Sequence, residues 1–140
     1  NNRRLTGFEQ IAKEHGCSVQ MVAFPFNSTP TIRRATLREK LLADQPDGIF
    51  CTDDQTALLC IQEARRAGMR VPEDVQVIGY DGSDYVQEYH PELSTIVQPV
   101  EDIADLLVRL LFSRLQKNDD QLLDKYVLPI KLLQRDSLRK

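Results

Sequence analysis

Side chains that could bind a ligand stand at the ends of three short apolar stretches. The first stretch ends in Phe24, with Phe26 close behind, the second is followed by Asp53 and the third by Asp81. Arg4 opens a helical stretch upstream of them. Carboxylates accept from vicinal hydroxyls, a guanidinium donates through a rigid fork, and a flat ring covers the apolar face of a sugar. This combination suits a polyhydroxylated ligand.

Each of these residues also has a structural interpretation. Asp53 could cap a helix, which is compatible with ligand contact. Asp81 could end a strand and form a turn with Gly82. Phe24 and Phe26 are of a type found more often in a core than on a ligand platform. The residues alone leave these alternatives open.

The sequence gives less support to metal-dependent and nucleophilic chemistry. Asp53, Asp54 and Asp81 could form a magnesium site at strand ends, as in phosphoryl-transfer proteins. However, no Lys follows a strand where it would meet a phosphoryl oxygen, and there is no glycine-rich phosphate loop. The G-x-S-x-G elbow of nucleophilic hydrolases is also missing. We therefore expect no enzyme, no cofactor and no bound metal, and a magnesium-dependent receiver or phosphatase is the less favoured alternative.

The elements that must position these residues follow from the hydrophobic period. It predicts helices over about 3–15, 30–42, 54–67 and 100–115, strands over 19–24, 49–51, 75–80, 93–97 and 126–133, and a polar turn over 117–120. The strand, helix and strand over 49–80 have the length of a right-handed parallel crossover. The prediction is an α/β fold with an open, mainly parallel sheet in three layers. Ligands bind such sheets outside the carboxyl ends of the strands, where the candidate residues gather.

Composition narrows the class of protein further. The 140 residues carry a net charge of -3 and contain no run of Lys or Arg. This charge argues against the binding of a nucleic-acid backbone by this chain alone. No apolar stretch approaches membrane-spanning length. Three cysteines without metal-ligand spacing predict neither a disulfide framework nor a zinc site. We expect a cytoplasmic protein and, from the abrupt start in a helix, a segment of a longer one.

Four stretches resemble the LacI/GalR family of bacterial transcriptional repressors in both order and spacing. They are RLTGF at 4–8, PDGIFCTDDQTAL at 46–58, AGMRVPEDVQVIGYD at 67–81 and PELSTIVQP at 91–99. Together they extend across nearly the whole chain. The sequence GYDG at 79–82 with YVLP at 126–129 is most similar to the branch of the family that controls sucrose operons.

The resemblance implies a periplasmic-binding-protein-like type I core, of which this chain is the C-terminal lobe. Residues 1–98 would form that lobe, 99–128 a crossover helix and linker toward the N-terminal lobe, and 129–140 the returning strand. The DNA-binding domain would then be absent from this chain. A sugar, sucrose or a phosphorylated sugar, would bind in the interlobe cleft and alter operator binding allosterically. A sugar-binding protein of a transport system has the same lobes and remains the alternative.

The resemblance also implies roles for particular residues. The implied ligand contacts are Arg4, Phe24, Phe26, Asp53, Asp81 and Gln98. Several family members carry Asn where this chain has Asp53, and a carboxylate can only accept hydrogen bonds. The family dimerises through this lobe, which implies a homodimer contact. The residues implied for that contact are Leu58, Leu59, Tyr85 and Tyr89, and operator DNA would be bound through the N-terminal domain.

Overall fold

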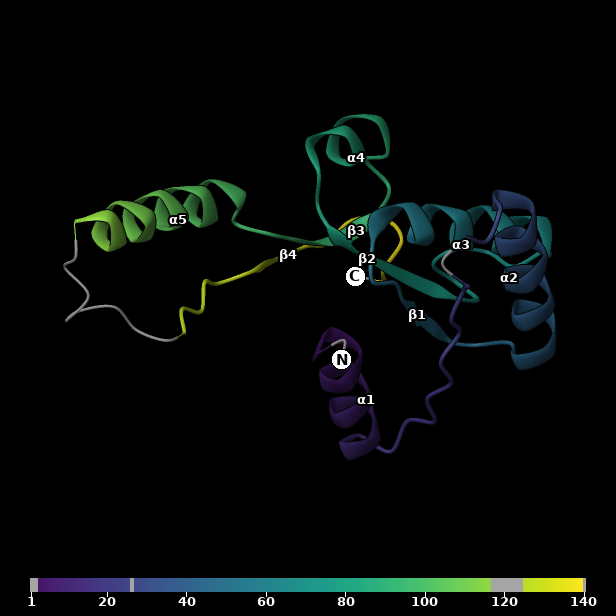
Figure 1. Cartoon of the computed structure of the whole chain (residues 1–140). Coiled ribbons are helices and arrows are strands. Elements are labelled where there is room, and N and C mark those ends of the chain that lie inside the picture. The colour runs from purple at the N-terminus through teal and green to yellow at the C-terminus, as the bar shows by residue number, and fades with distance from the viewer. Residues whose placement is uncertain (1–2, 26, 117–124, 140) are drawn as a thin grey trace.

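The computed structural model describes residues 3–25, 27–116 and 125–139. The elements are α1 (Arg3–Glu14), α2 (Pro30–Asp44), β1 (Gly48–Phe50), α3 (Asp54–Arg66), β2 (Gln76–Asp81), α4 (Asp84–Tyr89), β3 (Ser94–Val97), α5 (Val100–Leu115) and β4 (Lys131–Leu133). The strands form one sheet in the order β1-β2-β3-β4 (Figure 1). Strands β1, β2 and β3 are parallel, and β4 is antiparallel to β3. The predicted α/β fold with an open, mainly parallel sheet is confirmed.

Local signals in the sequence account for the helix ends. The Thr29 side chain accepts from the Ile32 N–H at 3.3 Å and caps α2. Asp53 caps α3 in the same way. Gly16 follows α1 with a φ of 75°, a left-handed conformation that glycine adopts without a steric cost. The predicted starts of α2 and α3 and the predicted end of α1 are therefore confirmed.

Helices lie on both faces of the sheet. Helix α3 packs on β2, and α2 packs on α3. Ile49 of β1 contacts the buried core under these helices. Because side chains alternate along a strand, the neighbouring Phe50 points to the other face. There its ring stacks on Phe8 of α1, with 5.0 Å between ring centroids.

A buried carboxylate joins α2 to α3. Glu63 is fully buried. Its oxygens accept from Arg34 at 3.1 Å, from Arg66 at 2.7 Å and from two nitrogens of Arg38 at 3.0 and 2.7 Å. Burial by itself raises the pKa of Glu63, but the hydrogen bonds from the three guanidinium groups outweigh it, and the pKa is lowered. Glu63 is thus a charged link between the two helices.

The chain after β4 is tied back to the sheet. Ser137 is 1% exposed, and its hydroxyl donates to the Val77 carbonyl at 2.6 Å and accepts from the Ser94 N–H at 2.8 Å. The Val77 N–H in turn donates to the Ser137 carbonyl at 2.9 Å. The last described residues therefore belong to the same packed unit as β2 and β3.

The structure differs from the prediction in three places. Residues 19–24 form no strand in the described chain, because their backbone groups do not pair with the edge strand β1. The final strand is limited to Lys131–Leu133, which is where β3 has residues to pair with. The short helix α4, capped by Ser83, was not predicted. The predicted polar turn over 117–120 lies outside the described residues.

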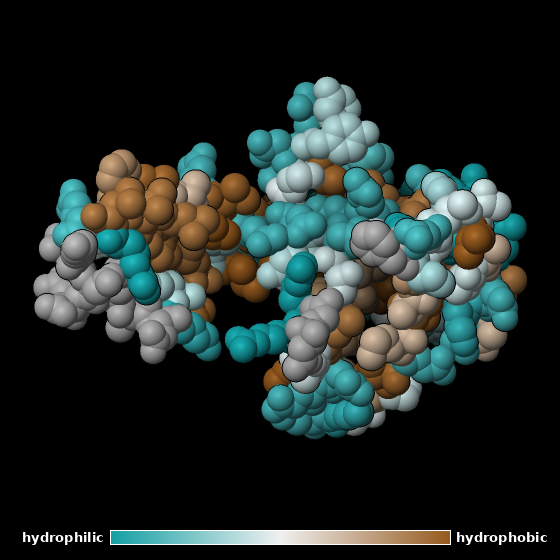
Figure 2. Space-filling view, in the orientation of Figure 1, coloured by the Kyte–Doolittle hydropathy of each residue, from teal (hydrophilic) through white to brown (hydrophobic). Residues whose placement is uncertain are grey.

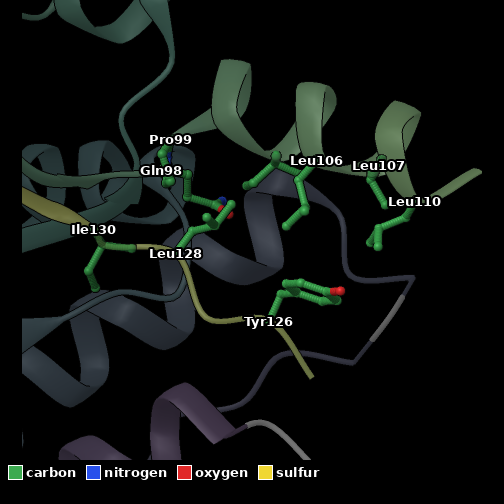
Figure 3. A pocket seen from close by; sticks show the side chains of 9 residues that line it. Gln98, Pro99, Leu106, Leu107, Leu110, Tyr126, Leu128 and Ile130 are labelled. Atoms are coloured by element: carbon green, nitrogen blue, oxygen red, sulfur yellow. The ribbon is translucent and has the colours of Figure 1, made fainter. Parts of the chain in front are cut away.

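Helix α5 lies apart from the sheet, at the end of two extended connections (Figure 1). Its apolar side chains form the large brown area of Figure 2, with Leu107, Leu111 and Phe112 each more than half exposed. One side of α5 faces Tyr126 and Leu128 across a hollow of about 400 Å³ (Figure 3). Within the described residues, no helix combines the length and apolar character needed to cross a membrane.

Candidate functional site

Arg4, Asp81 and Gln98 come together at the carboxyl ends of β2 and β3. Arg4 reaches this edge from the first turn of α1, and its Nη1 lies 3.9 Å from Asp81 Oδ1. The Gln98 side-chain amide donates to the same Asp81 oxygen at 2.7 Å. Residues far apart in the sequence thus place a cation, an anion and an amide within one small region.

The guanidinium of Arg4 is held in place by two further contacts. Its Nη1 donates to the Thr52 carbonyl at 2.9 Å, and its Cζ lies 4.4 Å from the centre of the Tyr80 ring. The Arg4 and Asp81 side chains are nevertheless 43% and 44% exposed, so both can meet a ligand. The role of Tyr80 was not predicted, because nothing in the sequence indicates that Arg4 would stack on it.

Asp81 stands in an unusual backbone conformation. Its φ is 116°, a region that favours glycine, and Gly82 follows with a φ of 64°. Gly82 is required here, because a Cβ on it would lie 2.7 Å from Cγ2 of Val97. Asp81 is the last residue of β2, and its carboxylate lies near Arg4 and Gln98.

Asp53 acts as the predicted helix cap. Its Oδ1 accepts from the Thr56 N–H at 2.7 Å, and its Oδ2 accepts from the Thr56 hydroxyl at 2.9 Å. Each carboxylate oxygen can accept a second hydrogen bond. Ligand contact by Asp53 therefore stays a prediction that is compatible with the cap.

The two phenylalanines do not join the group around Arg4 in the described structure. Phe24 is partly buried against the hydrophobic core, and its ring lies 5.9 Å from Cζ of Arg33. This agrees with the core interpretation of Phe24 rather than with a ligand platform. Phe26 lies outside the described residues.

A hollow of about 330 Å³ opens beside the site and connects it to the predicted dimer surface. Asp53 and Asp81 line it together with Leu58 and Tyr85. Leu58 and Leu59 are half-buried against the core. Tyr85 and Tyr89 are 63% and 62% exposed, and their rings lie 5.1 Å apart. The exposed tyrosines of α4 thus adjoin the candidate ligand site.

Asp54 is a buried carboxylate beside this site, and its bonds to the chain around Asp81 were not predicted. It is 4% exposed, accepts from the Gly82 N–H at 2.9 Å and accepts from the Thr95 hydroxyl at 2.5 Å. Burial raises the pKa of Asp54, and the bonds from Thr95 and Gly82 offset part of that effect. In the sequence its position indicated the start of a helix and, with Asp53 and Asp81, a candidate magnesium site.

The carboxylates of this edge do not converge on a common point. Asp53 bonds to Thr56, whereas Asp54 bonds to Gly82 and Thr95. Across the part of the chain that the structure describes, no group of three or more His, Cys, Asp or Glu residues could hold a metal ion.

Comparison with known proteins identifies the family. The family model described as a periplasmic binding protein-like domain matches residues 1–138. The chain belongs to the periplasmic binding protein-like domain family. This domain assignment agrees with the sheet and with the position of the site at its carboxyl edge.

Several relatives of this periplasmic binding protein-like domain are named as repressors. The chain is 38% identical to the sucrose operon repressor of Pediococcus pentosaceus, covering 94% of this chain and 40% of that protein. It is 34% identical to the sucrose operon repressor of Streptococcus mutans, covering 99% and 43%. The structure of the transcriptional regulator CelR with cellobiose matches with a TM-score of 0.79 and 30% identity, over 96% of this chain and 41% of that one. The predicted resemblance to LacI/GalR repressors is confirmed, since LacI family regulators are among the matching structures.

The domain matches only part of each relative. The chain spans about two fifths of the length of the sucrose operon repressors. Those relatives are named as repressors of sucrose operons.

Proposed function

We propose that this chain is the sugar-sensing and dimerisation part of a bacterial transcriptional repressor. The observation that carries the proposal is the convergence of Arg4, Asp81 and Gln98 at the carboxyl edge of the sheet. The names of the related sucrose operon repressors and the cellobiose bound to CelR support a sugar as the effector. A repressor that binds an operator works in the cytoplasm, so the proposal includes that location.

The geometry suits hydroxyl recognition. The Asp81 carboxylate accepts from sugar hydroxyls, and the Arg4 guanidinium donates to hydroxyl or ring oxygens. Tyr80 and the Thr52 carbonyl hold Arg4 in place before the sugar arrives, which reduces the ordering cost of binding. Asp53 and Gln98 would complete the polar set. We propose that these residues bind the sugar without converting it.

The same proposal covers the organisation of the chain. Residues 1–98 and 129–140 would form the C-terminal lobe, and 99–128 would cross toward an N-terminal lobe. The exposed apolar side chains of α5 support this, because a contiguous apolar surface marks an interaction site. The second lobe would cover α5 and close over the half-exposed Arg4 and Asp81.

Signal transfer would occur by population shift. Sugar in the cleft would favour one orientation of the two lobes, and this orientation would set the operator affinity of the paired DNA-binding domains. Dimerisation is proposed through Leu58, Leu59, Tyr85 and Tyr89. The hollow that Leu58 and Tyr85 share with Asp53 and Asp81 supports a link between sugar site and dimer surface.

Isothermal titration of the full-length protein with sucrose tests the proposal. Asp81→Ala should weaken sucrose binding by about tenfold or more, because a hydrogen bond to a charged group is lost. Asp47→Ala is the control, since the exposed Asp47 lies just before β1, at the opposite edge of the sheet. Unchanged sucrose affinity in Asp81→Ala would reject the site.

Operator binding separates the repressor from the transport alternative. In a gel-shift assay, sucrose should change the affinity of the full-length protein for the DNA upstream of its own operon. A protein that binds sucrose tightly but binds no such DNA would favour a binding protein of a transport system.

A further inference from the structure

The strained turn at Asp81 is held by its neighbours. A non-glycine residue with a φ of 116° persists only where the surroundings hold it. The peptide unit after Asp81 is fixed from both sides. The Gly82 N–H donates to Asp54 Oδ2 at 2.9 Å, and the Asp81 carbonyl accepts from the Gln98 N–H at 3.3 Å. In the next peptide unit, the Gly82 carbonyl accepts from the Gln87 side chain at 2.7 Å.

Asp54 is itself anchored firmly. It is the first residue of α3, and its Oδ1 accepts from the Thr95 hydroxyl of β3 at 2.5 Å. Space for the carboxylate exists because residue 79 is glycine, and a Cβ there would overlap Asp54 Oδ1. With 4% of its surface exposed, Asp54 joins α3, β3 and the turn after β2. It is a fixed point beneath the candidate site.

We infer that Asp54 is a positioning residue for the proposed sugar site. Asp54 sets the direction of the Asp81 carboxylate through the Gly82 peptide. The inference rests on the proposed function, because it concerns the same site. Asp54 points its two oxygens at Gly82 and Thr95 and acts on the sugar through Asp81. Removing the Asp54 carboxylate releases the turn, and Asp81 then no longer presents its oxygens in the binding direction.

Two substitutions of Asp54 separate positioning from charge. Asp54→Ala removes both hydrogen bonds and should lower sucrose affinity of the full-length protein by about tenfold or more. Asp54→Asn keeps an acceptor for the Gly82 N–H, and its amide nitrogen can donate to the Thr95 hydroxyl. We therefore expect Asp54→Asn to restore sucrose affinity to within about threefold of the wild type.

A matched control lies on the same helix. Glu63 is also a buried carboxylate of α3, but its partners are Arg34, Arg38 and Arg66, far from the Asp81 turn. Glu63→Gln should reduce thermal stability and leave sucrose affinity within about twofold of the wild type. Titrations are carried out well below the melting temperature of every variant.

Hydrogen exchange reports on the turn without a ligand. The Gly82 amide should exchange faster in Asp54→Ala than in the wild type, because its acceptor is gone. If Asp54→Ala does not fold, Thr95→Val removes one bond to Asp54 and should still weaken sucrose binding by about threefold.

The outcomes distinguish the inference from the function on which it rests. A wild type that binds none of sucrose, cellobiose and lactose overturns the proposed function, and the inference with it. A wild type that binds one of these sugars, with Asp54→Ala or Thr95→Val binding equally well, overturns the inference alone. Loss of affinity in Glu63→Gln equal to that in Asp54→Ala also overturns it, because a general loss of stability would then explain both.

Discussion

Replacing Glu63 by Gln tests whether the arginine cluster stabilises the lobe. The two carboxylate oxygens accept four hydrogen bonds from three arginines of α2 and α3. Gln has nearly the same shape but keeps one acceptor oxygen, and its amide N–H groups would face guanidinium donors. The two bonds from Arg38 to Oε2 are the ones that this change removes if the remaining oxygen faces Arg34 and Arg66.

The expected loss is about 2–3 kcal/mol of unfolding free energy. A hydrogen bond to a charged group contributes about 1.5–3 kcal/mol, and removing one partner of a buried pair costs about 3–5 kcal/mol. The arginine side chains are 32%, 49% and 55% exposed, so water can solvate them once the carboxylate is gone. Because of this solvation, the expected loss of unfolding free energy lies below the cost of removing one partner of a fully buried pair.

Thermal unfolding followed by circular dichroism measures the effect. For a domain of this size the loss corresponds to a melting temperature lower by roughly 10 °C. Glu9→Gln is the control, because the same substitution there removes only an exposed ion pair with Lys13 and should change stability by less than about 0.5 kcal/mol. A Glu63→Gln protein that melts with the wild type would refute the reasoning.

Acid provides a second measurement on the same pair of proteins. Because the folded-state pKa of Glu63 lies below its ordinary value of 4.5, the carboxylate stabilises the fold above that pH. This stabilisation is lost as the pH falls through the folded-state pKa. The difference in melting temperature between the wild type and Glu63→Gln should therefore shrink below about pH 4.5.

Two further predictions concern glycines and cysteines. Gly79→Ala should destabilise the protein by more than about 2 kcal/mol, because the added methyl would overlap a buried carboxylate. Gly7→Ala in α1 meets no atom within 4 Å and should be neutral or stabilising by roughly 0.5–1 kcal/mol; equal melting temperatures for both variants would contradict this. Iodoacetamide at neutral pH should label the exposed Cys17 and spare the buried Cys51 and Cys60 until unfolding, as counted by mass spectrometry. The hydrogen bond with Cys60 and burial raise the pKa of Cys51, so early labelling of Cys51 would contradict the packing.

Much of the fold could be predicted because its signals are local. The cap at Asp53 and the cap at Thr29 with Pro30 lie within a few residues of the helices that they start. Each of the strands β1, β2 and β3 contains two adjacent apolar residues, as expected of strands covered on both faces: Ile49 and Phe50, Val77 and Ile78, and Ile96 and Val97. The order of strand and helix then places Asp53 and Asp81 at one edge of the sheet.

The predicted and observed structures differ where a strand depends on a neighbouring strand for its hydrogen bonds. Residues 19–24 have the composition of a strand, but a strand exists only when a neighbour accepts its hydrogen bonds. The last strand is short for the same reason, since β3 offers partners only to Lys131–Leu133. Composition cannot predict which edge of a sheet will be extended.

The residues of the site also fall into two groups, those that the sequence indicates and those whose role depends on tertiary contacts. Residue types and the topology rule were enough to select Arg4 and Asp81, and the family resemblance added Gln98. The structure brings these three residues together. Asp54 and Glu63 occupy ordinary helix positions in the sequence, and most of their partners lie 25 to 41 residues away. Short-range patterns report on caps and periods, whereas a buried charge is stabilised by whichever groups the completed fold brings to it. For that reason the chemistry of this edge could be predicted from the chain, and the network that holds it in position could be read only from the folded structure.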